Sequence, residues 1–462
     1  MKVLTVDIGS TYTKLTAIDC QKRRIMGTSQ SFTTIDEDVT IGFNKAFRLL
    51  TSQEGCEDFE YDKLLVCSSA AGGLKMVALG LVPDLTAKAA RTAASNAGAK
   101  VVKTFAYEIS GGEQQEIYDI NPDLVLLCGG TDGGNKEVII ANARRLCNID
   151  RPFTTIVAGN KSANDDIARV FKEAGKDCVI TENVMPEFNK LNIEPARDAI
   201  RQMFIARIIE AKGLNKIQVK TPYKIIPTPL AVLQACELLS KGTERQQGRG
   251  DLLAVDIGGA TTDVYSMASG EPTIDNTLMK GLPEPWMKRT VEGDLGMRYS
   301  LKHVFDQLTR RDFRSEAHQQ KVKEWVELCS AHPSTLAEAG SEEELIEEFL
   351  GRSAVAMAVE RHCGRMADVY TPMGLMHTLE GKDLMGVPSV IGIGGVVRNS
   401  RRPVEILRGS AYDVNHAECT KPTHPKFYLD SQYIFAAMGL LRTIDEELAF
   451  ELLDKNTIEI TA

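Results

Sequence analysis

Two short segments of this chain carry residues suited to binding phosphate. The first, VLTVDIGSTYTK, spans residues 3–14, and the second, LLAVDIGGATTD, spans residues 252–263. In each, an apolar run leads into Asp-Ile-Gly and then into small and hydroxyl-bearing residues. Such a turn surrounds phosphate oxygens with backbone N–H groups and hydroxyls, because glycine allows close backbone approach. Both segments therefore predict a phosphate-binding tip of a β-hairpin.

The acidic residues of these tips, Asp7 and Asp256, indicate a metal ion. A carboxylate and a phosphate repel each other, whereas Mg²⁺ prefers a few carboxylates, several waters and the phosphates of its ligand. We therefore expect Asp7 and Asp256 to bind Mg²⁺ and to be catalytic. Lys14 is either a phosphate-side cation or a solvent-facing strand residue. Asp263 stands at the matching place in the second segment.

The same order of motifs occurs twice along the chain. Asp7 and Asp256 are 249 residues apart (256 − 7). The segments PDLVLLCGG, at 122–130, and PSVIGIGG, at 388–395, repeat with an offset of 265 residues (394 − 129). A single Asp-x-Gly-Ser/Thr is often an ordinary turn. Two ordered copies predict two similar halves that face each other over one phosphate-bearing ligand.

The double glycine at Gly394–Gly395 has two interpretations. It either lies flat against a nucleoside, where a side chain would collide, or forms a strand-to-helix turn, and both can hold. Gly129–Gly130 is expected to be its first-half counterpart, with a turn as the stronger interpretation. The chain contains no G-x-x-x-x-G-K-[ST] motif, so it is not a P-loop protein.

Strand and helix patterns alternate through the first part of the chain, which favours an α/β fold with parallel strands. We expect a first half at 1–185, a crossover at 186–250 and a second half at 251–462. The second half should hold a helical insertion at about 286–368. There, Ser341 and Glu344 predict a capping box that opens a helix at 342–366. The acidic face of this region is either a docking surface or, more simply, a solvated helix face.

Composition limits the partners and the compartment. With 54 Lys and Arg against 63 Asp and Glu, the net charge of −9 offers no basic excess for nucleic acid. The ten scattered cysteines are typical of free thiols in a reducing compartment. No signal peptide and no apolar run long enough for a membrane span is evident, so we expect a cytoplasmic protein that does not bind membranes.

DIGSTYTK, DIGGATTD and IGIGGVVRNS, in this order, resemble the actin-like ATPase superfamily of acetate and sugar kinases, heat-shock chaperones and actin. The resemblance implies a duplicated actin-like (ribonuclease H-like) α/β fold, with two halves around a nucleotide cleft, and ATP or ADP with Mg²⁺ as cofactors. It assigns the phosphates to two turns and adenosine to the double glycine. The implied nucleotide-binding residues are Gly9, Ser10, Thr11, Tyr12, Thr13, Lys14, Gly258, Gly259, Ala260, Thr261, Thr262, Gly394 and Gly395.

The same segments, together with LLCGGTDGGN, are similar to the MutL/GlmL family of glutamate mutase accessory proteins, which is unrelated to the mismatch-repair proteins called MutL. This resemblance implies an ATPase that reactivates an adenosylcobalamin-dependent mutase by releasing damaged cobalamin. No D-x-H-x-x-G cobalamin motif is present, so we expect the protein to act on the mutase without needing to bind the cofactor itself.

Other functions on this fold stay open at the level of sequence. The main alternative is a small-molecule kinase of the acetate or sugar kinase type, followed by an actin-like scaffold. A reductive ATPase would require cysteine ligands for an iron–sulfur cluster. No catalytic base is evident, because Glu116 and Glu182 are candidates by polarity and location only and are more simply structural.

Overall fold

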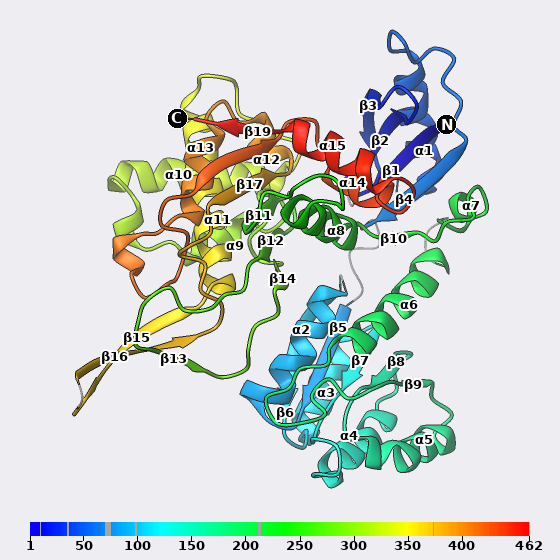
Figure 1. Cartoon of the computed structure of the whole chain (residues 1–462), viewed down its shortest axis with the longest axis vertical. Coiled ribbons are helices and arrows are strands. Elements are labelled where there is room, and N and C mark those ends of the chain that lie inside the picture. The colour runs from blue at the N-terminus through cyan, green and yellow to red at the C-terminus, as the bar shows by residue number, and fades with distance from the viewer. Residues whose placement is uncertain are drawn as a thin grey trace. The chain divides into compact units, whose positions relative to one another are not determined.

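The computed structural model divides the chain into two compact units (Figure 1). Unit 1 comprises residues 1–231 and 281–283, and unit 2 comprises residues 232–280 and 284–462. The residues that the structure describes are 1–9, 11–34, 37–69, 75–97, 99–210, 214–372 and 374–461, without the side chains of 84, 96, 100 and 204–210.

The first sheet of unit 1 carries the first predicted turn. Its order is β10-β4-β1-β2-β3, in which β1 to β3 are antiparallel neighbours and β4 and β10 run parallel to β1. Buried apolar side chains from these strands form a core with helix α1, which begins after the N-capping Asp38. The elements are β1 (Lys2–Ile8), β2 (Tyr12–Asp19), β3 (Arg24–Phe32), α1 (Val39–Thr51), β4 (Lys63–Ser68) and β10 (Ile226–Pro227).

The main sheet of unit 2 repeats this arrangement. Its order is β14-β12-β11-β17-β18-β19, and β11 pairs antiparallel with β12 and parallel with β17, as β1 pairs with β2 and β4. The shared order confirms the predicted α/β class and the duplicated actin-like fold. The strands are β11 (Leu252–Ile257), β12 (Thr262–Met267), β14 (Met287–Glu292), β17 (Ser389–Ile393), β18 (Lys426–Asp430) and β19 (Thr457–Ile460).

A second sheet in unit 1 is entirely parallel and has the order β6-β5-β7-β8-β9. The sequence predicted that residues 122–130 are the counterpart of residues 388–395, and this prediction was wrong. Residues 122–130 instead contain β7 of this parallel sheet. The counterpart of β17 is β4, which pairs with β1. The elements are β5 (Lys75–Gly80), α2 (Lys88–Asn96), β6 (Lys100–Ala106), α3 (Gly111–Ile120), β7 (Leu124–Leu127), α4 (Glu137–Cys147), β8 (Thr154–Val157), α5 (Asn164–Glu173) and β9 (Cys178–Ile180).

Three helices occupy the expected crossover region, and the change from unit 1 to unit 2 falls within the last of them. They are α6 (Glu194–Glu210), α7 (Leu214–Gln218) and α8 (Thr228–Lys241). The boundaries expected from sequence, at 185 and 250, stay a prediction.

The expected insertion at 286–368 is helical only in its middle. Its start is the edge strand β14, which pairs antiparallel with β12 from Glu292 opposite Thr262 to Met287 opposite Met267. Its end is a strand that begins at Arg365. Ser341 caps α11 as predicted, by accepting a bond from the Glu344 N–H at 3.2 Å. The helices are α9 (Leu301–Gln307), α10 (Glu316–Ala331) and α11 (Glu342–His362).

The remaining elements complete unit 2. A small sheet of order β13-β16-β15 projects as an arm in Figure 1. Its strands are β13 (Thr277–Lys280), β15 (Arg365–Thr371) and β16 (Gly374–Glu380), and the remaining helices are α12 (Gly395–Asn399), α13 (Pro403–Leu407), α14 (Phe435–Leu441) and α15 (Glu446–Asn456). Single turns of other helix types lie at Pro83–Ala87, Lys161–Ala163, Arg310–Asp312, Arg408–Ser410 and Val414–His416.

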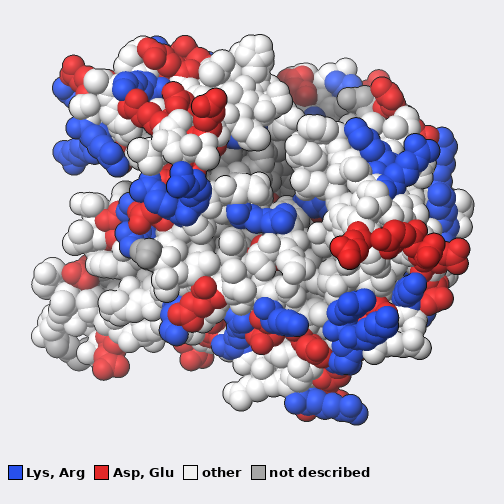
Figure 2. Space-filling model, turned by 90° about the horizontal axis from the view of Figure 1, so that it is seen from above, with Lys and Arg blue, Asp and Glu red and all other residues white. Residues whose placement is uncertain are grey.

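The surface and the thiols agree with the composition. Acidic and basic side chains are interspersed in small groups on the face shown in Figure 2. All ten cysteines are free thiols. Within the described residues, no helix combines the length and the apolarity needed to cross a bilayer.

Lys382 is one of two lysines that are buried among the described residues of unit 2, the other being Lys421. Lys382 is fully buried, and its Nζ donates to the carbonyl oxygens of Pro285 at 2.9 Å and Trp286 at 2.6 Å. Gly270, at φ +73°, lies against its stem, since an added Cβ would come within 2.3 Å of Lys382 Cγ. Burial is the main cause that lowers the pKa of Lys382, to about 7 from 10.5.

This buried lysine predicts a pH dependence of stability. Between the two pKa values the unfolded chain holds the proton and the folded chain releases it, so the free energy of unfolding rises with pH. From about pH 7 to about pH 9 the wild type should gain about 2 kcal/mol relative to Lys382→Met. Urea unfolding at both pH values measures this difference. Equal pH slopes in the two proteins would contradict it.

Candidate functional site

The first predicted turn is a tight hairpin tip between β1 and β2. The Gly9 N–H donates to the Tyr12 carbonyl oxygen at 2.9 Å, and a Cβ on Gly9 would lie 2.8 Å from that oxygen. Thr11 accepts a bond from the Thr33 N–H at 2.9 Å. Ser10 lies outside the described residues. Glycine is therefore required at position 9 for the turn to close.

The second turn, between β11 and β12, has the same closing bond: the Gly258 N–H donates to the Thr261 carbonyl oxygen at 2.9 Å. The carbonyl oxygens of Gly258, Gly259 and Ala260 accept bonds of 2.8–3.0 Å from the segment 297–300. Within the described part of the chain, the N–H groups of Gly259 and Ala260 donate no hydrogen bond. The turn therefore presents donors while its acceptors are occupied, which suits an anion.

The threonines that begin the strands after the turns are alike in both halves. Thr13 is buried, and its Oγ1 lies 3.0 Å from Thr33 Oγ1. Thr262 is also buried, and its hydroxyl donates to the Leu295 carbonyl oxygen at 2.5 Å. Both hydroxyls hold a neighbouring segment against the hairpin. Tyr12, the strand residue before Thr13, stacks on Phe32 with ring centroids 4.7 Å apart.

Asp7, at the carboxyl end of the central strand β1, is held by three side chains. Its Oδ1 accepts from Thr228 Oγ1 at 2.6 Å and from Cys67 Sγ at 3.5 Å, and its Oδ2 lies 3.5 Å from Lys14 Nζ. Only 8% of Asp7 is exposed. Burial first, and then the charge of Asp7, raise the pKa of Cys67 well above its ordinary value, so the thiol stays protonated and donates. Lys14 is thus a partner of Asp7, and its interpretation as a phosphate-side cation stays a prediction.

Sequence reasoning missed Thr228. It begins α8 directly after the short strand β10, which runs parallel to β4 and brings it to Asp7 from 221 residues away. Its signal is the Pro-Thr-Pro of residues 227–229, where a strand gives way to a helix. The sequence pattern alone does not show that Thr228 bonds to Asp7, because the bond depends on the order of the strands in the sheet.

Asp256 occupies the matching place at the end of β11, beside the double glycine. A Cβ on Gly394 would lie 2.8 Å from Asp256 Oδ1 and 2.5 Å from the Ile257 carbonyl oxygen. Gly394 has φ +97°, and its carbonyl oxygen accepts from the Arg398 N–H at 3.1 Å, so α12 starts at Gly395. Gly394–Gly395 thus forms a strand-to-helix turn, and its contact with adenosine stays a proposal.

A second carboxylate, Asp263, pairs with Asp256 in register across β11 and β12. Its charge is compensated by Arg289 of β14, whose Nε and Nη2 donate to Asp263 Oδ1 at 2.9 and 2.6 Å. Thr261 Oγ1 donates to the other oxygen at 3.1 Å. Burial alone would lower the pKa of Arg289, but the adjacent Asp263 raises it overall, so the guanidinium stays charged. Sequence reasoning did not identify Arg289.

The donors fit a magnesium ion that keeps most of its waters. Among the described residues, no three His, Cys, Asp or Glu side chains gather as a metal-binding group. Each unit by itself has an aspartate at its turn, and Mg²⁺ commonly takes one or two carboxylates with phosphates and waters. The two residues considered as a catalytic base have local partners: Glu116 pairs with Lys103, and Glu182 accepts a hydrogen bond from Asn192 at 3.1 Å.

The ion pair beside Asp256 predicts a large cost for removing its cation. Arg289→Met leaves Asp263 buried and uncompensated, and should lower the free energy of unfolding by about 3–5 kcal/mol. The double variant Asp263→Asn with Arg289→Met should recover most of that loss. Chemical unfolding of the three proteins measures the coupling, and a double variant no more stable than Arg289→Met would contradict it.

Residues 3–457 match the family described as MutL protein. The chain is 45% identical over 462 residues to Protein MutL of Clostridium tetanomorphum, with 99% of each chain covered. It is also similar to gluconate kinase from Lactobacillus acidophilus, at 10% identity and a TM-score of 0.35 over 100% and 92% of the two chains. Ethanolamine utilization protein EutJ from Carboxydothermus hydrogenoformans matches at 10% identity and a TM-score of 0.27 over 97% and 90%. Scores this low add nothing to the sheet topology. The family match over residues 3–457 and the relative that is 45% identical over its full length show that the chain belongs to the MutL protein family.

Proposed function

We propose that this protein binds ATP with Mg²⁺, hydrolyses it, and thereby reactivates an adenosylcobalamin-dependent mutase, with glutamate mutase as the expected partner. The observation that carries the proposal is the repeated turn. Both copies close with the same bond and follow a strand whose last residue but one is aspartate. Membership of the MutL protein family supports the partner.

In this proposal the two turns hold the phosphates of one nucleotide. The free N–H groups of Gly259 and Ala260 would donate to phosphate oxygens. Asp7 and Asp256 would hold Mg²⁺ and orient its waters, and the ion, when bound, supplies positive charge to the phosphoryl oxygens. Gly394–Gly395 would contact adenosine.

The residues around the two aspartates have distinct roles in the proposal. Thr228 and Lys14 fix the orientation of the Asp7 carboxylate through its two oxygens. Arg289 compensates the charge of Asp263, which lies opposite Asp256 in the register of β11 and β12. An uncompensated Asp263 would add a second negative charge where phosphate is expected and would oppose nucleotide binding.

Changing either aspartate tests the metal role. Asp7→Asn and Asp256→Asn should each lower Mg²⁺-dependent ATP hydrolysis by about a hundredfold, because each removes a carboxylate that would hold the metal. The exposed Asp58→Asn and Asp275→Asn serve as matched controls and should retain activity. Circular dichroism checks the fold. Unaltered turnover in both turn variants would remove the metal role.

The partner is tested by ATP hydrolysis with and without glutamate mutase inactivated by damaged cobalamin. The proposal predicts faster hydrolysis with the inactivated mutase, accompanied by release of the damaged cobalamin and recovery of mutase activity when fresh cofactor is added. Intact mutase is the control. Hydrolysis stimulated instead by a sugar or a carboxylate would point to a small-molecule kinase and contradict the reactivating role.

A further inference from the structure

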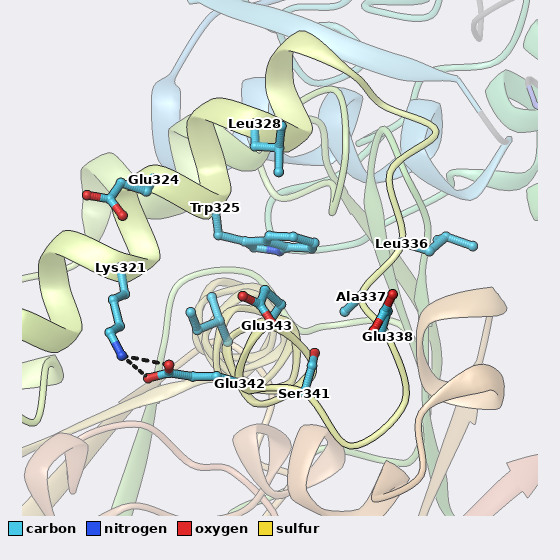
Figure 3. A pocket seen from close by; sticks show the side chains of 11 residues that line it. Lys321, Glu324, Trp325, Leu328, Leu336, Ala337, Glu338, Ser341, Glu342 and Glu343 are labelled. Carbon is cyan, nitrogen blue, oxygen red and sulfur yellow. Dashed lines mark hydrogen bonds and ion pairs between the residues drawn. The ribbon is translucent and has the colours of Figure 1, made fainter.

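A groove lies within unit 2, between α10, α11 and the loop that joins them, and it contributes to neither turn. Its volume is about 560 Å³. Figure 3 shows that α10 supplies one wall, the first turn and a half of α11 the floor, and the connecting loop the far wall. The inner faces of α10 and α11 belong to the core of unit 2, with Trp325 and Ile346 in the same cluster as Val255 of β11, so the groove lies at the outer edge of that core.

The interior of the groove is apolar. Trp325 and Leu328 come from α10 and Ile346 from α11. In Figure 3 the side chain of Leu336, in the loop, points away from Trp325 and so lies at the outer edge of the groove. Leu336 is 75% exposed, and Leu328 is also exposed, although both are large apolar side chains. Exposed leucines beside a tryptophan form a surface that gains free energy when a partner's apolar side chains cover it.

The indole of Trp325 provides an independent indication of a ligand. Trp325 is only 7% exposed, and its Nε1–H has no hydrogen-bond acceptor within the described residues. In Figure 3 the ring lies across the groove with its nitrogen on the side of α11. A buried donor without an acceptor is unfavourable, and buried indoles normally find a partner. A polypeptide bound in the groove has acceptors to offer.

The rim of the groove is acidic. Four glutamates line it, namely Glu324, Glu338, Glu342 and Glu343, against the single lysine Lys321. That lysine is already paired with Glu342, through Nζ to both carboxylate oxygens at 2.6 and 2.7 Å. The remaining charge is negative and exposed to solvent, so it favours a partner with basic side chains on either side of its apolar contacts.

We propose that this groove binds a basic, amphipathic helix of a partner protein. Leucine-sized side chains of that helix pack against Trp325 and Leu328, with Leu336 at the outer edge of the contact, while its lysines and arginines meet the acidic rim, as in other helix-in-groove complexes. The inference rests on the proposed function in one respect: the partner is the mutase whose reactivation the nucleotide drives. The groove is then the place where the mutase is held.

The groove itself is tested with a peptide. In the variant Trp286→Phe, Trp325 is the one tryptophan left, since the chain has two. A synthetic helical peptide of leucine and lysine should shift the emission of Trp325 and bind more weakly as salt is raised. The matched peptide of leucine and glutamate should not bind. Equal binding of the two peptides, or no effect of either on Trp325, would overturn the proposal.

The mutase is tested with the full-length chain. Leu336→Asp should weaken binding of inactivated glutamate mutase by about tenfold, since exposed apolar anchors carry much of the affinity of such contacts. Val414→Asp is the matched control, because Val414 is 77% exposed and lies outside the groove. Both variants should hydrolyse ATP normally without the mutase.

The outcomes separate the two proposals. If the wild type and Leu336→Asp bind the mutase equally well, the groove assignment fails and the reactivating function stands. If the leucine–lysine peptide binds but the mutase binds neither the wild type nor Leu336→Asp, the groove is still a site for a basic helix, but the mutase is not its partner. If Glu324→Lys combined with Glu338→Lys leaves peptide affinity unchanged relative to the exposed Glu271→Lys, the charge argument is overturned.

Discussion

The proposed site depends on one electrostatic requirement: a carboxylate at the end of a central strand would have to lie next to phosphate without adding uncompensated charge. The two halves meet this requirement differently. In unit 1 the residue opposite Asp7 is Lys14, a cation within 3.5 Å. In unit 2 the residue opposite Asp256 is a second acid, Asp263, and Arg289 compensates it from the next strand. Lys14 therefore compensates Asp7 directly, whereas Arg289 compensates the acid that lies opposite Asp256.

Sheet order makes this possible. Because β1 and β11 each lie between a hairpin partner and a parallel strand, their ends receive side chains from both neighbours. The hairpin partner supplies Lys14 or Asp263, and the parallel neighbour supplies Cys67 or the turn at Gly394. Glycine at 9 and at 394 is required by close backbone contacts there, so these positions are fixed by sterics as well as by any ligand.

Local patterns in the sequence were sufficient to predict the two hairpins, the α/β class, the duplication and the helix cap at Ser341. They failed where the structure depends on long-range pairing. PDLVLLCGG was matched to PSVIGIGG because an apolar strand that ends in two glycines is common to many parallel sheets. The charged segment MKRTVE was included in the helical insertion, although it forms β14 and pairs with β12. Thr228 and Arg289 gain their roles from residues that are distant in sequence, which no local pattern shows.

The central claim is that the two turns serve one nucleotide, and the stoichiometry of binding tests it most directly. Isothermal titration of the purified full-length chain with a non-hydrolysable ATP analogue and Mg²⁺ should give one site per chain. The variants Asp7→Asn and Asp256→Asn should each weaken that same site. Two independent sites, each lost with only one of the variants, or no binding at all, would contradict the account.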